Sequence, residues 1–434
     1  MLADPGTARV RRTTAAFVST LILTACGESL AGPVERDTVP PTLSTAPVLV
    51  RTTACQGGSA GGFPCNGVDL VARMTASALR PGRAATHVND VWGWTDPQTG
   101  VEYALVGRDD GLSIVDLSTP HAPRPIAFLP SHTGSSIWRD MKVYADHVYV
   151  VADNIAGHGM QILDLTRLRG LAAFTELSAD ARYTRVSAVH NLAINEETGF
   201  AYALGSSRGG DTCGGGLHMI NLSNPTSPSF AGCHAVPGTG RQGRGYTHDV
   251  QCVVYRGPDG AYAGREICVG TNETAIVVSD VSDKANPRVL STGGYADYGY
   301  VHQGWLSEDH RYFYQNDELD ELNGRVSRTR LLVWDLADLD DPVLVTEHLG
   351  PTGAIDHNLY VRGNFIYHSN YAFGVRILDI SNPATPVERG FFDTVAGHDN
   401  NTWDGSWSIF PWFESGILVA TSWDEGLFVL RLQP

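Results

Sequence analysis

The sequence predicts an all-β fold of seven similar units, and three observations support this prediction. The 434 residues include 47 glycines and 23 prolines, which suit many turns better than long helices. Hydrophobic residues make up 42% of the chain, enough for a sizeable core. A short strand-like element then recurs seven times, at intervals of about fifty residues. Together these observations predict a seven-bladed β-propeller with one unit per blade.

The recurrent element is an alternating run, rich in β-branched residues, that ends in most copies at Asp or Asn before a turn. Its copies are "GLSIVDLSTP" (111–120), "GMQILDLTRL" (159–168), "GLHMINLSNP" (216–225), "AIVVSDVSDK" (275–284), "LLVWDLADLD" (331–340), "GVRILDISNP" (374–383) and "GLFVLRLQP" (426–434). Two strand-like runs precede each copy. A fourth run follows six of them, such as "PIAFLP" (125–130) in the first unit and "FTELSA" (174–179) in the second. Units of four strands are typical of propeller blades.

The seventh unit has no run after its repeated element, because the sequence stops at Pro434. The run "VDLVARMT" (68–75), ahead of the first unit, has the right pattern to take that place. We therefore expect it to complete the last blade and to leave no unpaired edge where the ring closes. A β-sandwich or a solenoid is the alternative. A sandwich would not repeat one element seven times, and a solenoid usually has shorter repeats.

The N-terminus predicts a bacterial lipoprotein signal. Arg9, Arg11 and Arg12 precede an apolar run (13–23) that is too short to span a bilayer, and "LTAC" (23–26) follows. We expect a signal peptide over 1–25, lipidation of Cys26, a flexible tether over 26–54 and the propeller over 55–434. The alternative is an ordinary secretion signal. Either way the protein would be secreted, and a lipid at Cys26 would anchor it to a membrane of the cell envelope or at the cell surface.

The other six cysteines predict disulfides, since their number is even and the expected compartment is oxidising. Local spacing favours the pairs Cys55–Cys65, Cys213–Cys233 and Cys252–Cys268. Free buried thiols or a metal site are the alternatives, although no Cys-x-x-Cys motif is present. The formal net charge of −16 argues against a nucleic-acid partner.

Four histidines recur in similar settings: "VHN" (189–191), "THD" (247–249), "VHQ" (301–303) and "DHN" (356–358). Each stands where the innermost strand of a blade is expected to begin, at what we call the upper face. We therefore expect His190, His248, His302 and His357 to meet at the mouth of the central channel. The same reasoning places a polar ring there: Asn89, Asp90, Arg139, Asp140, Asn191, Asp249, Gln303, Asn358 and Asp404.

Three interpretations of this region compete. The histidines could bind a transition metal, with carboxylates such as Asp249 orienting them. Four histidines hold iron on a propeller axis in carotenoid-cleaving oxygenases, which is an analogy of geometry only. Alternatively, an acidic loop could bind calcium through Asp317, Glu318, Asp320 and Glu321. In the third interpretation the polar residues form hydrogen bonds that tie neighbouring blades together and need no ligand.

The repeated element resembles the LVIVD repeat of bacterial surface proteins. Longer stretches, such as "NDVWGWTDPQTGVEYALVG" (89–107) and "YVHQGWLSEDHRYFYQNDELDE" (300–321), resemble the choice-of-anchor B family. This resemblance covers about residues 55–434 and implies a surface-exposed propeller without an assigned activity. We expect a non-catalytic binding or scaffolding protein that uses its upper face to bind an envelope protein or glycan. The alternative is a metal-dependent enzyme, such as an oxidative one, with unidentified catalytic residues beyond the four histidines.

Overall fold

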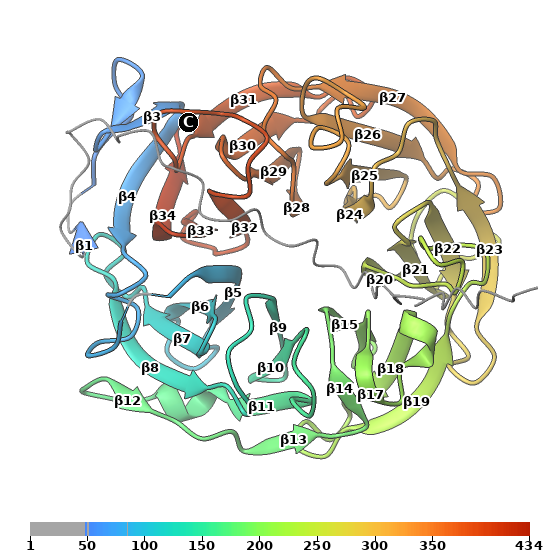
Figure 1. Cartoon of the computed structure of the whole chain (residues 1–434), viewed down its shortest axis with the longest axis horizontal. Coiled ribbons are helices and arrows are strands. Elements are labelled where there is room, and N and C mark those ends of the chain that lie inside the picture. The colour runs from blue at the N-terminus through green and yellow to red at the C-terminus, as the bar shows by residue number, and fades with distance from the viewer. Residues whose placement is uncertain (1–47, 50–51, 85) are drawn as a thin grey trace, which may run out of the picture. The chain divides into compact units, whose positions relative to one another are not determined.

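The computed structural model describes residues 48–49, 52–84 and 86–434, so the predicted signal peptide, Cys26 and most of the tether lie outside the described residues. Within these ranges the strands form seven antiparallel blades around a central channel (Figure 1). Their helical content is limited to two short 3-10 helices, η1 (Leu165–Leu168) and η2 (Cys213–Gly215). The prediction of an all-β, seven-bladed propeller is therefore confirmed. No helix among these residues is long and apolar enough to cross a bilayer.

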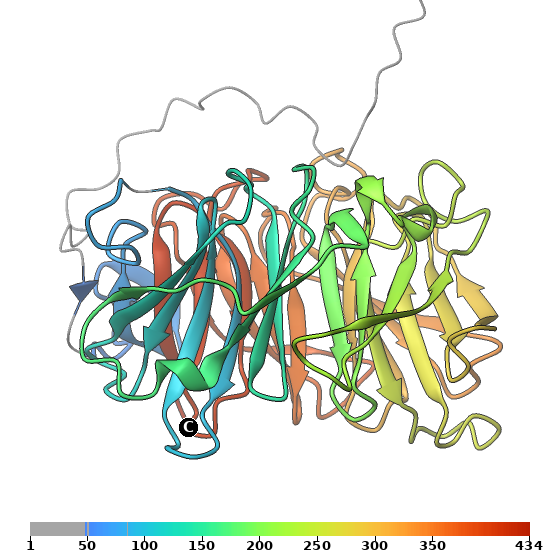
Figure 2. The ribbon, with the colours of Figure 1, turned by 90° about the horizontal axis from the view of Figure 1, so that it is seen from below.

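Each blade has its first strand at the channel and its fourth strand at the rim. The first strands are β5 (Val88–Thr95), β9 (Arg139–Tyr144), β15 (Asn191–Asn195), β20 (Asp249–Val254), β24 (Val301–Leu306), β28 (Leu359–Arg362) and β32 (Ser406–Phe410). The second strands are β6 (Glu102–Arg108), β10 (His147–Ala152), β16 (Phe200–Leu204), β21 (Glu266–Thr271), β25 (Tyr312–Asp317), β29 (Phe365–Asn370) and β33 (Leu418–Ser422). Figure 2 shows the blades from the side, with their strands running between two loop-bearing faces.

The third and fourth strands complete the blades. The third strands are β7 (Gly111–Asp116), β11 (Met160–Asp164), β18 (Leu217–Asn221), β22 (Ile276–Asp280), β26 (Arg330–Asp335), β30 (Gly374–Asp379) and β34 (Gly426–Leu432). The fourth strands are β8 (Arg124–Pro130), β13 (Ala181–Tyr183), β19 (Ser229–His234), β23 (Arg288–Gly293), β27 (Val343–Leu349), β31 (Val387–Phe392) and, in the seventh blade, β4 (Val68–Met74). The second and third strands are almost wholly buried because neighbouring blades cover both of their faces, which explains their continuous apolar runs.

The polar residue that ends the repeated element forms a turn in each of the first six blades. Its side-chain oxygen accepts a hydrogen bond of 2.7–3.0 Å from the amide two residues later. These residues are Asp116, Asp164, Asn221, Asp280, Asp335 and Asp379. Asp and Asn favour such turns because their short side chains reach the backbone directly ahead. The repeat thus encodes both a strand and the turn that ends it.

The second blade differs from the expectation that residues 174–179 supply its fourth strand. Within that stretch, β12 (Thr175–Glu176) instead pairs in parallel with β8 of the first blade. The helix η1 follows β11 directly and buries Leu165 and Leu168, so the chain continues past its own blade to the edge of the first one. It then returns, and β13 completes the second blade.

Strands from distant parts of the sequence meet in the last two blades. The strand β4 pairs antiparallel with β34, so the seventh blade contains residues from both ends of the described chain (Figure 1). Just before it, β2 (Ser59–Ala60) and β3 (Phe63–Asn66) extend the sixth blade through β31, and β1 (Val48–Leu49) pairs with β4. The short β14 (Val186–Ala188) and β17 (Ser207–Gly210) form a separate pair. The disulfides Cys55–Cys65, Cys213–Cys233 and Cys252–Cys268 are confirmed.

Candidate functional site

The four predicted histidines lie together at the upper end of the channel. His190, His248, His302 and His357 stand at the start of the first strands of blades three to six, or just before them, and at most 7% of each is exposed. The centroids of successive rings are 4.5, 4.2 and 4.6 Å apart. We call these four residues the histidine cluster.

Every histidine of the cluster uses its Nδ1 atom in a hydrogen bond to an oxygen. The partners are Asp153 Oδ2 for His190 (2.9 Å), the His302 carbonyl for His248 (2.8 Å), Asn316 Oδ1 for His302 (3.1 Å) and the Trp407 carbonyl for His357. Because these oxygens only accept, each Nδ1 carries the proton and donates. Each neutral ring then has a lone pair on Nε2, the atom available to a metal.

Glu318 brings a carboxylate to the Nε2 atoms. Its Oε2 lies 3.7 Å from His302 Nε2, and its Oε1 lies 3.5 Å from His357 Nε2. The Tyr371 hydroxyl donates to Oε1 at 3.1 Å and so fixes the orientation of this carboxylate. One ligand atom from each of Glu318, His302 and His357 falls within 4.8 Å of the other two, a spacing that fits a shared metal ion.

Electrostatics keep three of the rings neutral. Burial lowers the pKa of His248 and His302 well below the usual value, and it lowers the pKa of His357 to about 3. Burial also acts to lower the pKa of His190, but the hydrogen bond and charge of Asp153 outweigh it and raise this pKa. Burial raises the pKa of Glu318 to about 7.

The short distance between the Nε2 atoms of His190 and His248 requires a proton or a cation between them. Their Nε2 atoms are 2.8 Å apart, although both Nδ1 atoms are already donors. Two lone pairs at this distance repel, so a proton must lie between them. The imidazolium of His190, which Asp153 favours, supplies that proton. A metal cation would satisfy the same two lone pairs.

Four residues of the predicted polar ring join neighbouring blades. Each makes side-chain hydrogen bonds to the backbone of the next blade. These bonds are Asn89 Nδ2 to the Ile137 carbonyl (3.0 Å), Leu192 N to Asp140 Oδ2 (2.6 Å), Asn191 Nδ2 to the His248 carbonyl (3.0 Å), and both Gln303 Nε2 to the Leu359 carbonyl (3.0 Å) and Leu359 N to Gln303 Oε1 (2.9 Å). The Nδ1 bonds of His190, His248 and His357 also join neighbouring blades, so the histidines share this role with the polar ring. Their Nε2 atoms are left to face a neighbouring histidine or Glu318.

The other ring residues do not join the cluster. Arg139 turns to the first blade and donates to the carbonyls of Arg108 and Asp109. Asp404 is partly exposed and lies 3.1 Å from His398. Asn358 is buried next to His357, and its amide side chain is neither a carboxylate nor an imidazole that could bind the same metal.

Asp90 and Asp249 occupy a deeper level of the channel, together with Lys142. The Lys142 ammonium lies 3.8 Å from Asp90 Oδ2. Burial raises the pKa of Asp249 to about 7, while the nearby charge of Lys142 opposes this rise. These two carboxylates therefore belong to the interior of the channel and not to its mouth.

The acidic loop does not gather its four carboxylates around one point. Asp317 accepts from the amides of Gly299 and Tyr300, and Asp320 pairs with Arg330 at 2.8 Å. Glu321 accepts from the Arg330 amide at 3.1 Å. Only Glu318 faces the histidines. The cation that this loop binds in the structure is thus the guanidinium of Arg330. Calcium binding by the loop stays a prediction.

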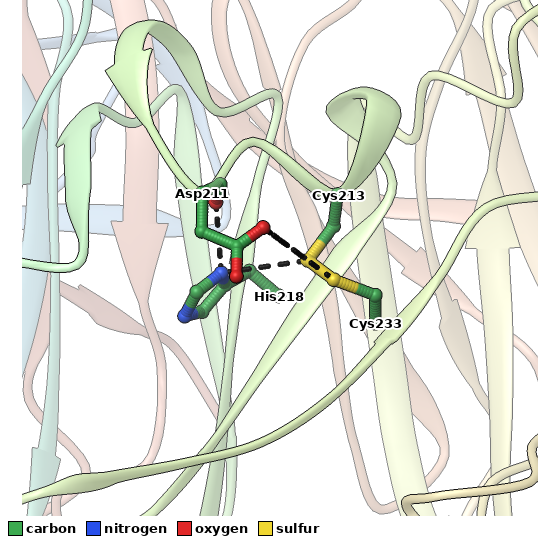
Figure 3. A group of neighbouring side chains, drawn as sticks. All are labelled: Asp211, Cys213, His218 and Cys233. Carbon is green, nitrogen blue, oxygen red and sulfur yellow. Dashed lines mark hydrogen bonds between the residues drawn. A yellow bond between two sulfur atoms is a disulfide. The ribbon is translucent and has the colours of Figure 1, made fainter.

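A second group of metal-ligand residue types lies on blade three (Figure 3). Cys213 and Cys233 are joined in a disulfide, so neither offers a thiolate. His218 donates from Nδ1 to the Asp211 carbonyl (2.9 Å) and accepts from the Tyr183 hydroxyl at Nε2 (2.8 Å). With these atoms occupied, the group stabilises a loop and leaves no set of free ligands.

Sequence patterns identified the histidines but not the residues that orient them. Asp153 and Tyr371 lie in loops between the second and third strands, and Asn316 lies near the end of β25. Each is one polar residue among many in such positions. The sequence predicts only that these loops return to the upper face. It therefore indicates the region of the site but not which polar residue in it orients a histidine.

Comparisons with known proteins agree with this architecture. The LVIVD repeat matches residues 102–125 and 356–394, so the chain contains LVIVD repeats. No curated protein matches the chain significantly. Among solved structures, the β-propeller domain of Myceliophteria thermophila Cps50 (Swd1) is 13% identical, with a TM-score of 0.53, over 81% of this chain and 98% of that one. A protein from Lactobacillus plantarum is also 13% identical, with a TM-score of 0.50, over 77% and 88%. At this identity the likeness concerns the fold alone.

Proposed function

We propose that this protein is a binding protein of the bacterial cell envelope that holds a transition-metal ion at the upper mouth of its channel. The observation that supports the proposal is the shared orientation of the histidine cluster. All four Nδ1 atoms donate to oxygens, which directs the Nε2 atoms of His302 and His357 toward Glu318 and those of His190 and His248 toward each other. Histidines that bind metals are oriented in the same way by their second nitrogen.

The donor set favours a metal of intermediate hardness. Imidazole nitrogens with one carboxylate suit iron, zinc, copper or nickel better than calcium, which prefers a shell of oxygens. His302 and Glu318 belong to blade five and His357 to blade six, so a metal held by these three residues would crosslink these two blades beneath the upper loops. It would stabilise the surface through which we propose that the protein binds an envelope protein or glycan. The sequence "LTAC" (23–26), in which small residues precede the cysteine as in bacterial lipoprotein signals, supports the proposed anchorage.

Metal analysis of the untagged protein, purified without chelators, tests the proposal. We expect close to one transition-metal ion per chain, and loss of that ion in the double variant His302→Gln/His357→Gln. The matched control is His234→Gln, a buried histidine outside the cluster whose Nε2 bonds Ser279 at 2.9 Å. This control should keep its metal. Equal metal content in the double variant and the wild type would contradict the assignment of these ligands.

Failure of the wild-type protein to take up iron, zinc, copper, manganese or nickel would contradict metal binding altogether. In that case His190 would remain an imidazolium that donates to His248, and the cluster would only tie blades together. Circular dichroism of each variant is the control for folding, because the loss of a buried histidine can also disturb packing.

A further inference from the structure

A cavity of about 580 Å³ occupies the lower half of the channel, at the end away from the histidine cluster. Residues near the ends of the first strands line it, and none of the four clustered histidines does. Its volume is within the range of sites that bind small molecules, about 300–1,000 Å³. The propeller therefore has two separate sites on one axis, and the metal proposed above does not account for this one.

Aromatic rings form much of the cavity wall. Trp92, Trp305, Tyr360 and Trp412 come from β5, β24, β28 and the segment after β32, and their ring centroids lie 5.1–5.8 Å from one another along the wall. Trp305 and Trp412 are only partly buried. A ligand in the cavity would thus contact the faces or edges of several rings.

Carboxylates dominate the charge of the cavity. Asp249 lines its inner end, and Glu196 and Glu308 line the wall and stand exposed. Among the described lining residues, Lys142 is the one that carries a permanent positive charge, and Asp140 already pairs with it at 2.5 Å. The Asp249 carboxylate accepts a hydrogen bond from its neighbour, the Val250 amide (2.7 Å), and among the described residues no basic side chain forms an ion pair with it.

The aromatic wall already contacts one ammonium group. Lys142 Nζ lies 4.5 Å from the centroid of the Trp92 ring, a cation–π distance. From the aromatic wall, the excess of carboxylates and this internal example, we infer that the cavity binds a small organic cation with a primary or quaternary ammonium head. The head would lie among the tryptophan and tyrosine rings, with Asp249 as its counter-ion.

Other ligand classes fit this cavity less well. An anion would meet three carboxylates and a lysine whose charge is already compensated. A neutral sugar can stack on tryptophan, but it would leave the Asp249 carboxylate without a counter-ion. An ammonium ligand satisfies both the rings and the carboxylate, which makes it the class that the lining favours.

Calorimetric titration of the full-length protein with choline chloride, cadaverine and glucose tests this inference. We expect binding of at least one of the two ammonium compounds and none of glucose. Asp249→Asn keeps the size of the side chain and removes its charge, and we expect it to weaken ammonium binding on the order of tenfold. The matched control is Asp404→Asn at the upper face, which should bind like the wild type.

A second variant tests the same inference at an exposed position, where the substitution does not disturb the packing around Asp249. Glu308→Gln lies at an exposed position of the lining, and it should weaken binding by a few-fold because it removes a longer-range charge. The inference is overturned if neither ammonium compound binds at millimolar concentration. It is also overturned if glucose binds as well as they do, or if Asp249→Asn and Glu308→Gln both bind like the wild type.

Discussion

Replacement of Lys142 by Met tests whether the channel interior depends on one buried cation. The Lys142 ammonium lies 2.5 Å from Asp140 Oδ1 and 3.8 Å from Asp90 Oδ2, and the three side chains are 11%, 4% and 6% exposed. Removal of one partner from a buried ion pair costs about 3–5 kcal/mol, because it leaves an uncompensated charge. Asp140 would keep its bonds from the Met141 and Leu192 amides, so we expect about 3 kcal/mol.

Urea unfolding followed by tryptophan fluorescence measures this loss, at a slightly alkaline and at a mildly acidic pH. The loss should be smaller at the acidic pH, because burial raises the pKa of Asp90 well above its usual value and favours its neutral form there. The matched control is Arg256→Met. Arg256 pairs with Glu197 at the same 2.5 Å, but both side chains are more than half exposed, so the control should unfold like the wild type.

The comparison of the two variants shows whether the free energy lost depends on the burial of the ion pair, since both pairs have the same distance. A loss of less than about 1 kcal/mol for Lys142→Met would match an exposed ion pair and would refute the reasoning. Equal losses in Lys142→Met and Arg256→Met would refute it as well. A loss that does not shrink at acidic pH would show that Asp90 stays charged without the lysine.

Three further predictions concern the seam, the pH dependence and the anchor. Leu70→Ala in β4 should lower the free energy of unfolding as much as Leu430→Ala in β34, by about 3 kcal/mol each, because the two buried residues face each other across the seam; chemical denaturation measures both losses. Thermal stability should rise as the pH falls from about 8.5 to about 6.5, because burial raises the pKa of Asp249 to about 7 and of Asp393 to about 8. These two carboxyls therefore hold more protons in the native state than in the unfolded chain, where the pKa of Asp is about 4. The clustered histidines with a lowered pKa act in the opposite sense, but only near the lower end of this range, close to their usual pKa of about 6.5. Cys26→Ala should release the protein from the membrane fraction, as immunoblotting of cell fractions would show.

Each of these predictions has an outcome that contradicts it. A much smaller loss for Leu70→Ala than for Leu430→Ala would mean that β4 contributes little to the closure of the ring. A melting temperature that falls or stays constant between about pH 8.5 and about pH 6.5 would refute the argument from buried carboxyls. Retention of the Cys26→Ala variant in the membrane fraction would refute the lipoprotein prediction.

The sequence predicted those features that repeat. The blades, the turns after Asp or Asn and the meeting of the four histidines follow from a fixed spacing of strands, because each blade places equivalent positions at equivalent points. The features that occur once were not predictable in this way. The sequence places Glu318 in an acidic loop, but it does not indicate that Tyr371 and the pairing of Arg330 with its neighbours turn this carboxylate toward the histidines. The detour of β12 likewise depends on η1, which only the second blade has.

The β4–β34 pairing also affects the order in which the chain can fold. Arg73 in β4 donates to the Glu425 carbonyl across 352 residues, so β4 leaves the ribosome long before its partner. At roughly 5–20 residues per second, about 20–70 s pass before β34 exists. Until β34 follows, β4 lacks the strand with which it pairs along its length, although the sixth blade, which it also contacts, can form first. Because we propose that the chain is exported, a chaperone that holds it before it folds should bind this early strand, and release should coincide with completion of the last blade.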